Sequence, residues 1–295
     1  MQKIRIMTDS AADLPVEIVR ELGIRVLPIP ITVDGRSYYE RVDMTNEEFY
    51  QLLLTSRRIP TTSHINASRY LEEYQQAYHE GYTHLLNVTI NSLGSNMYNA
   101  ACLARSLFYE DSGVSESEFP IEVIDSHTYT MAYGVAVKRA AEQAAAGEDF
   151  ARIAADMRDW FSRLEIAFSV YSLDFVKKSG RVSCAAAFVG DLLGLRPMIV
   201  FSGGVATVVD KVRGDHNVVP KLLDVVRRRA DRPEDYPFLV IRGTSVEQGD
   251  AFAALVQKEM PAIHLDGVYS VGSSVAINCG PSVVAAVYAG KKRAD

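Results

Sequence analysis

Residues 88–104 read VTINSLGSNMYNAACLA, and this stretch indicates the architecture of the first half of the chain. An apolar run ends, a cluster of small polar residues follows, and an alanine-rich segment begins. This order is typical of a strand that leads through a tight turn into a helix. Free backbone N–H groups at a helix N-terminus favour an anion, so Ser92, Ser95 and Asn96 form a candidate anion site. Plain N-capping by Ser95 explains the same residues and stays open.

Two further strand-like runs end in polar residues. KIRIMTDS at 3–10 ends in Asp9-Ser10, and FPIEVIDS at 119–126 ends in Asp125-Ser126. Ligands of parallel sheets bind at the carboxyl ends of the strands, so we expect all three polar clusters at one edge. Each Asp-Ser pair could bind a cation or could cap the segment that follows it.

The order of the elements predicts two domains. Strand and helix patterns alternate up to about residue 150, with Asp13 as the expected N-cap of the first helix and Asp34-Gly35 as a turn. Farther on, RPMIVFSGGVATVVDKVRG at 196–214 indicates two strands around a Gly-Gly hairpin turn. We therefore predict an α/β fold: an N-terminal α/β domain with a parallel sheet over 1–155, and a C-terminal α+β domain with a mixed or antiparallel sheet over 156–295.

The composition narrows the class of function. The 295 residues carry a net charge of -6, which argues against a nucleic-acid partner. Cys102, Cys184 and Cys279 lie far apart among apolar or small residues, as expected of reduced buried thiols. The six histidines lack metal-ligand spacing, and there is no P-loop, GxSxG or HExxH pattern. We therefore expect neither a metal nor a cofactor.

The location is expected to be cytoplasmic. MQKIRIMTDS at the N-terminus contains an apolar run too short for a signal peptide, and a strand explains it better. No stretch approaches 18 uncharged apolar residues, so no membrane span is expected, although peripheral or transient membrane contact stays open.

Three other polar segments are candidate binding sites. Thr61, Thr62 and Ser63 form a loop rich in hydroxyl groups. KKSGRVS at 177–183 and DKVRG at 210–214 place basic residues beside glycines, which suits a phosphate or a protein partner. An ordinary loop is the alternative for the first segment, and solvated charges are the alternative for the two basic segments.

Several motifs together resemble the DegV family, also called the EDD fold, over about residues 3–290. The matching segments, in order, are TDSAADLP, PTTSHINAS, INSLGSNMYNAA, VIDSHTYTMAYG, the long run DFVKKSGRVSCAAAFVGDLLGLRPMIVFSGGVATVVDKVRG, and NCGPSVVAAVY. Their number, order and spacing carry the resemblance rather than any one of them.

The resemblance implies a non-catalytic carrier of one long-chain fatty acid. The tail would occupy an apolar tunnel, and the carboxylate would lie at polar side chains in the cleft between the domains. A partner fatty acid kinase would convert the bound acid to an acyl phosphate. By this resemblance the acid would be bound at Thr62, Ser63, His64, Ser95, Asn96 and Asn278, and Arg181 and Arg213 would serve the kinase or the transferred phosphate.

The chain departs from the family pattern at the expected head-group site. Asn278 replaces the family's histidine, Ser95-Asn96-Met97 replaces Ser-Gly-Thr, and His64-Ile65-Asn66 replaces Gln-Pro-Ser. Asparagine donates hydrogen bonds but carries no charge, so another lipid or amphiphile is an alternative ligand. A phosphotransferase or hydrolase using Ser95 with His64 or Asp9 is a third hypothesis. Apolar candidates for the tunnel, which would serve equally as ordinary core, are Phe168, Phe188, Leu192, Leu193 and Met198.

Overall fold

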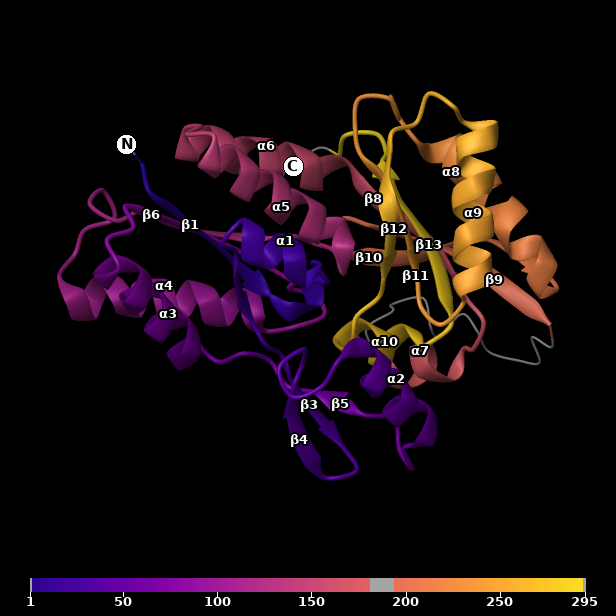
Figure 1. The fold of residues 1–295 in the computed structure, drawn as a ribbon, viewed down its shortest axis with the longest axis horizontal. Helices are drawn as coiled ribbons and strands as arrows, with labels where there is room; N and C mark the ends of the chain where they lie inside the picture. Colours follow the sequence, from indigo (N-terminus) through magenta and orange to yellow (C-terminus); the bar gives the residue numbers. More distant parts are fainter. Residues whose placement is uncertain (1, 181–193, 294–295) are drawn as a thin grey trace. The chain divides into compact units, whose positions relative to one another are not determined.

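The computed structural model describes residues 2–180 and 194–293, which divide into two compact units (Figure 1). Unit 1 extends to Thr45 and resumes over Thr61–Phe161, whereas unit 2 holds Asn46–Pro60 and the described chain from Ser162 onward. Residues 46–60 thus pack with the second half of the chain although they lie in the first half of the sequence. The division into folding domains 1–155 and 156–295 stays a prediction.

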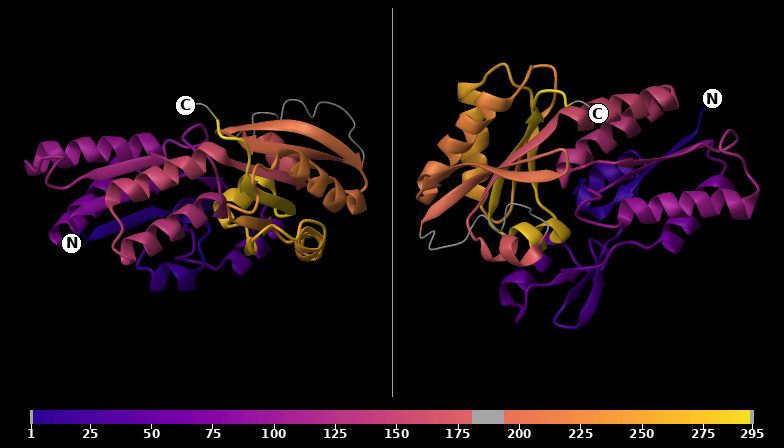
Figure 2. Two further views of the ribbon diagram at one scale, coloured as in Figure 1. Left: turned by 90° about the horizontal axis from the view of Figure 1, so that it is seen from above. Right: turned by 180° about the vertical axis from the view of Figure 1, so that it is seen from behind.

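A parallel sheet of four strands, in the order β2-β1-β6-β7, is the centre of unit 1 within the described residues. It lies between α5 and α6 on one side and α3 and α4 on the other (Figures 1 and 2). This confirms the expected α/β layer. The elements of unit 1 are β1 (Ile4–Asp9), α1 (Val16–Glu21), β2 (Arg25–Leu27), β3 (Pro30–Val33), β4 (Arg36–Tyr39), β5 (Thr61–Thr62), α3 (Ala67–His79), β6 (His84–Thr89), α4 (Met97–Ser112), β7 (Ile121–Asp125), α5 (Met131–Ala145) and most of α6 (Phe150–Arg163).

A smaller antiparallel sheet in the order β4-β3-β5 also belongs to unit 1. Its β3–β4 hairpin turns at Asp34 and Gly35, whose φ angles of 46° and 84° are those of the expected tight turn. Strand β5 adds to the other edge of β3, where Thr62 pairs with Ile31.

The expected N-cap of the first helix is wrong. Asp13 has a φ of 54° and closes a short 3-10 helix, Ser10–Ala12, instead of starting α1. Its carboxylate accepts a hydrogen bond of 2.5 Å from the hydroxyl of Thr130. Helix α1 begins after Pro15 without a capping side chain.

A mixed sheet of six strands, in the order β10-β9-β8-β13-β11-β12, is the centre of unit 2 among the described residues. The β9–β10 hairpin turns at Gly203 and Gly204, as expected, and the pairing of β11 with β12 is parallel. Helices α8 and α9 cover a core that includes Met198, Phe238 and Phe252. The elements of unit 2 are α2 (Asn46–Thr55), β8 (Leu164–Val170), α7 (Asp174–Ser179), β9 (Leu195–Ser202), β10 (Val205–Arg213), α8 (Val218–Arg229), β11 (Phe238–Arg242), α9 (Val246–Glu259), β12 (Leu265–Ser270), α10 (Ser273–Cys279) and β13 (Val283–Ala289).

Helix α2 packs with α10 inside unit 2. The hydroxyl of Tyr50 donates a hydrogen bond of 2.8 Å to the carbonyl of Val271, and Phe49 and Leu53 are buried. Burial of apolar side chains and hydrogen bonds, including one of 3.4 Å from the Ser273 hydroxyl to the Asn46 amide oxygen, therefore hold α2 to segments more than 200 residues away.

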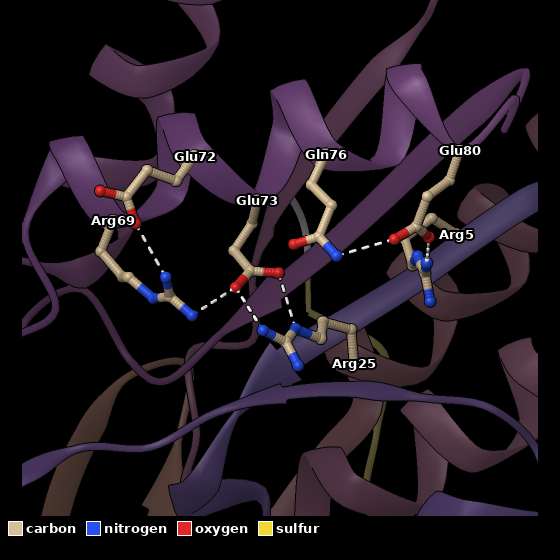
Figure 3. A network of polar contacts seen from close by, with 7 residues as sticks. All are labelled: Arg5, Arg25, Arg69, Glu72, Glu73, Gln76 and Glu80. Carbon is tan, nitrogen blue, oxygen red and sulfur yellow. Dashed lines mark hydrogen bonds and ion pairs between the residues drawn. The ribbon is translucent and has the colours of Figure 1, made fainter.

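A network of charged side chains fastens α3 to the edge of the parallel sheet (Figure 3). Arg25, on the edge strand β2, donates two hydrogen bonds of 2.6 and 2.5 Å to Glu73, and Arg69 donates a third of 2.6 Å. The Glu73 side chain is only 4% exposed, so its charge depends on these donors. Its neighbour Glu72 is 62% exposed, and Arg69 is its one ion-pair partner among the described residues.

Replacing Glu73 should therefore cost far more stability than replacing Glu72. We expect Glu73→Gln to lower the free energy of unfolding by about 1–3 kcal/mol, because it removes a charged acceptor from three hydrogen bonds. Glu72→Gln should change it by less than about 0.5 kcal/mol, as for other exposed ion pairs. Urea unfolding of both variants measures this, and equal losses would contradict a special role of Glu73.

Candidate functional site

The polar ends of the three strands lie at one level of the parallel sheet. Thr8 of β1 aligns with Val88 of β6, and Thr89 of β6 aligns with Asp125 of β7. The expected shared edge is therefore confirmed. After β1 the chain adds β2 on one side of it, and later adds β6 and β7 on the other side. The topological switch point, where such sheets bind ligands, is therefore between β1 and β6.

We call residues 91–96 the candidate turn, and it closes on the carbonyl of Asn91. The backbone N–H groups of Gly94 and Ser95 both donate to that oxygen at 3.1 Å. Helix α4 follows, with Asn96 as its N-cap residue and no capping side chain. The alternative that Ser95 serves as an ordinary N-cap is therefore wrong, and no side chain caps the first turn of α4.

Two half-buried hydroxyl groups of unit 1 are free to bind a ligand. Neither Thr62, in β5, nor Ser95, in the candidate turn, donates or accepts a side-chain hydrogen bond with any described residue. Ser63 and His64 follow Thr62 directly and are exposed. Asn96 is exposed too, and its amide oxygen accepts a hydrogen bond of 3.0 Å from Asn99.

The other expected site residues belong to unit 2 or lie outside the described residues. Asn278 lies on α10, and its amide donates one hydrogen bond of 2.7 Å to the carbonyl of Ser274, which leaves its second N–H for another acceptor. Arg213 ends β10 and is exposed. Arg181 lies outside the described residues, as do Phe188, Leu192 and Leu193 of the expected tunnel. Phe168 is buried in β8, and Met198 is part of the core under α8 and α9.

Asp9 has a structural role at the end of β1. Its carboxylate accepts hydrogen bonds from the N–H groups of Ala11 (3.1 Å) and Ile90 (2.9 Å) and from the hydroxyl of Tyr133 (2.6 Å). The capping interpretation of Asp9 is thus the correct one. Complete burial raises the pKa of Asp9 from 3.8 to about 6, against the lowering effect of these hydrogen bonds.

Asp125 occupies the matching position at the end of β7. Its carboxylate accepts hydrogen bonds from the N–H groups of Ser92 (3.1 Å) and His127 (2.9 Å) and lies 3.1 Å from Nδ1 of His127. Burial alone would raise the pKa of Asp125, but the bonds from His127 and Ser92 outweigh burial, and the pKa lies below 3.8. The carboxylate therefore remains ionised at neutral pH.

Two tyrosines that the sequence analysis did not single out also form hydrogen bonds at this edge of the sheet. Tyr133 binds Asp9, and Tyr129 binds the amide of Asn91 at 3.1 Å. Both lie in the stretch TYTMAYG, in which only the preceding Asp-Ser pair signalled a polar strand end. A tyrosine in a helix pattern is usually core, so the sequence gives no sign of these bonds.

No cluster of three or more metal-ligating side chains occurs in residues 2–180 and 194–293. In the same part of the chain, every helix is too short or too polar to cross a bilayer.

Comparisons with known proteins agree over most of the chain. A family model described as an uncharacterised protein of the DegV family matches residues 3–291. A DegV domain-containing protein of Caldanaerobacter subterraneus is 30% identical over 227 residues, which cover 77% of this chain and 78% of that protein.

Two solved structures share the fold. A stearic-acid-binding protein of Eubacterium ventriosum superposes with a TM-score of 0.86 at 25% identity and covers 98% of each chain. A fatty-acid-binding DegV family protein of Thermus thermophilus superposes with a TM-score of 0.85 at 25% identity, covering 98% of this chain and 100% of that one.

The raised pKa of Asp9 predicts a pH dependence of stability. The folded protein binds the Asp9 proton more tightly than the unfolded chain does, so the contribution of Asp9 to stability is full below pH 4 and declines as the pH rises through 6. The decline should be about 3 kcal/mol. The Asp9→Asn variant should lack this decline in the free energy of unfolding.

Urea unfolding of wild type and Asp9→Asn between pH 4 and 7.5 tests this. The difference in free energy of unfolding, wild type minus variant, should fall across that range. Asp34→Asn, at the exposed β3–β4 turn, controls for the loss of one carboxylate. A difference that stays level with pH would refute the assignment.

Proposed function

Since the chain belongs to the DegV family, we propose that it binds a long-chain fatty acid with the carboxylate at Thr62 and Ser95. The observation that carries the proposal is the match, over 98% of the chain, to a stearic-acid-binding protein at 25% identity. The free hydroxyls of Thr62 and Ser95 support it, because each offers a donor to an anionic acceptor.

The energetics suit such a ligand. A hydrogen bond to a charged group contributes roughly 1.5–3 kcal/mol, so two hydroxyls would select strongly for an acid over a neutral head group. Burying the methylenes of a 16-carbon tail would contribute roughly 10 kcal/mol before the entropic cost of binding. The tail therefore supplies most of the affinity and the hydroxyls most of the selectivity.

The proposal includes the remaining expected residues. Asn278 would offer its second amide proton to the head group, Ser63, His64 and Asn96 would border it, and the tail would lie in an apolar tunnel. The ligand itself would be the only bound group that the protein requires.

We further propose that the protein is a carrier, not the catalyst, in the formation of acyl phosphate. Arg213, with Arg181, would contact a fatty acid kinase or the phosphate being transferred. Purified chain with ATP and stearate should then form no acyl phosphate until such a kinase is added. Turnover by the chain alone would favour the enzyme hypothesis instead.

Native mass spectrometry of the protein purified from a bacterial host tests the ligand class first. One fatty acid per chain, identified after denaturing release, is the expected result. A bound neutral lipid would favour the alternative of an altered head-group site. An empty protein that gains no thermal stability from added fatty acids would refute lipid binding.

Removing one hydroxyl should weaken binding of the acid. We expect Ser95→Ala and Thr62→Val each to raise the Kd for stearate by about tenfold or more, the equivalent of one hydrogen bond to a charged group. Ser106→Ala, on the exposed side of α4, is the matched control. Equal Kd values for stearate, its methyl ester and its alcohol would remove the carboxylate assignment.

Reversing the charge of Arg213 should slow phosphorylation of the bound acid without affecting its binding. We expect Arg213→Glu to lower the rate with the kinase about tenfold or more, because it changes the sign of a charge at the docking surface. Lys211→Glu makes the same change one exposed position earlier on β10. Equal effects of the two variants would mean that only net charge matters.

A further inference from the structure

The loop between β7 and α5 is interlocked with the candidate turn. The N–H of Ser126 donates to the carbonyl of Thr89, and the N–H of Asn91 donates to the carbonyl of Thr128, both at 3.1 Å. The Asn91 amide also donates to the hydroxyl of Tyr129 at 3.1 Å. The two loops thus share hydrogen bonds on either side of residue 90.

Asp125 is the charged member of this contact. Its side chain is 7% exposed, and it accepts the N–H of Ser92, the second residue of the candidate turn. The same carboxylate contacts His127 through both the backbone N–H and the ring. A hydrogen bond from a backbone N–H to an ionised carboxylate is about twice as strong as one between neutral groups.

The backbone around Asp125 is held in uncommon conformations. His127 has a φ of 50°, and Thr130 has a φ of 56° with a ψ of -155°. Such angles cost free energy in residues other than glycine and persist only where surrounding contacts impose them. Tyr129 lies between His127 and Thr130 in the sequence, and its side chain packs directly against Gly94. A Cβ at position 94 would be 2.1 Å from the hydroxyl oxygen of Tyr129. The loop is therefore shaped to fit against the turn.

We propose that Asp125 is the positioning residue of the head-group site: it fixes the backbone of the candidate turn through Ser92 and thereby fixes the Ser95 hydroxyl. This inference rests on the proposed function, because it assigns Ser95 to the carboxylate. Asp125 itself touches no ligand in this role. Its effect on binding passes entirely through the turn.

A purely structural Asp125 would give different results in a double-mutant cycle. If Asp125 acts through Ser95, its replacement loses its effect on binding once the Ser95 hydroxyl is gone, because interacting residues are non-additive. If it only stabilises unit 1, the two effects add. The matched control is Glu122→Gln, which removes another carboxylate from β7. Glu122 pairs with Arg158, away from the candidate turn.

The experiment measures stearate affinity and hydrogen exchange on the full chain. We expect Asp125→Asn to raise the Kd by about fivefold or more, but by less than about twofold in the Ser95→Ala background. Amide exchange in peptides covering 90–97 should speed up in Asp125→Asn, beyond any change in peptides of β1, and not in Glu122→Gln. His127→Asn, which keeps a residue type that tolerates positive φ, should give a smaller change in the same direction.

Two results would overturn the inference. Additive losses of affinity in the double variant would show that Asp125 acts independently of Ser95. Unchanged exchange in residues 90–97 would show that Asp125 does not fix the turn. Failure of the proposed function has a separate signature, because Ser95→Ala would then leave the Kd unchanged, or stearate would not bind, while exchange in Asp125→Asn still increased.

Discussion

The carboxylate of Asp9 lies out of reach of water and accepts hydrogen bonds from three different segments of unit 1. One donor belongs to the turn after β1, one to the residue after β6, and one to helix α5. A buried charge that lost these donors would be severely destabilising, so each of the three segments must place its donor next to the Asp9 carboxylate. Asp9 therefore fixes the positions of the loops at the carboxyl edge of the parallel sheet.

Asp125, at the end of β7 and two strands away from β1 in the sheet, also accepts hydrogen bonds from loop backbone. The Asp125 carboxylate is only 7% exposed, has a pKa below its ordinary value, and accepts N–H groups from the candidate turn and from its own loop. Hydrogen bonds to carboxylates thus help to order the loops at this edge. The hydroxyl groups of Thr62 and Ser95 stay free of internal partners in the described structure, which is the condition for an outside acceptor to use them.

The sequence was informative where local pattern decides structure. Alternating apolar residues located the strands, and the turns at Asp34-Gly35 and Gly203-Gly204 followed from the residues that tolerate positive φ. Asp13 was wrongly expected to cap α1, because its preference for Thr130 depends on a residue 117 positions away. Ser95 likewise resembled an N-cap by its spacing. The carbonyl of Asn91 instead accepts the N–H of Ser95 within the turn, and Asn96 is the N-cap residue of α4. The bonds of Tyr129 and Tyr133 are tertiary too, and no local signal announces them.

The placement of α2 has a consequence for how this protein can change during evolution. Residues 46–60 pack with unit 2, yet they connect β4 to β5, which both belong to the small sheet of unit 1. Neither unit is one continuous stretch of chain, so no single exchange of gene segments can transfer either of them whole. A recombination that replaced everything after residue 161 would pack α2 against a foreign α10. A single crossover would therefore always separate one segment from the unit with which it packs.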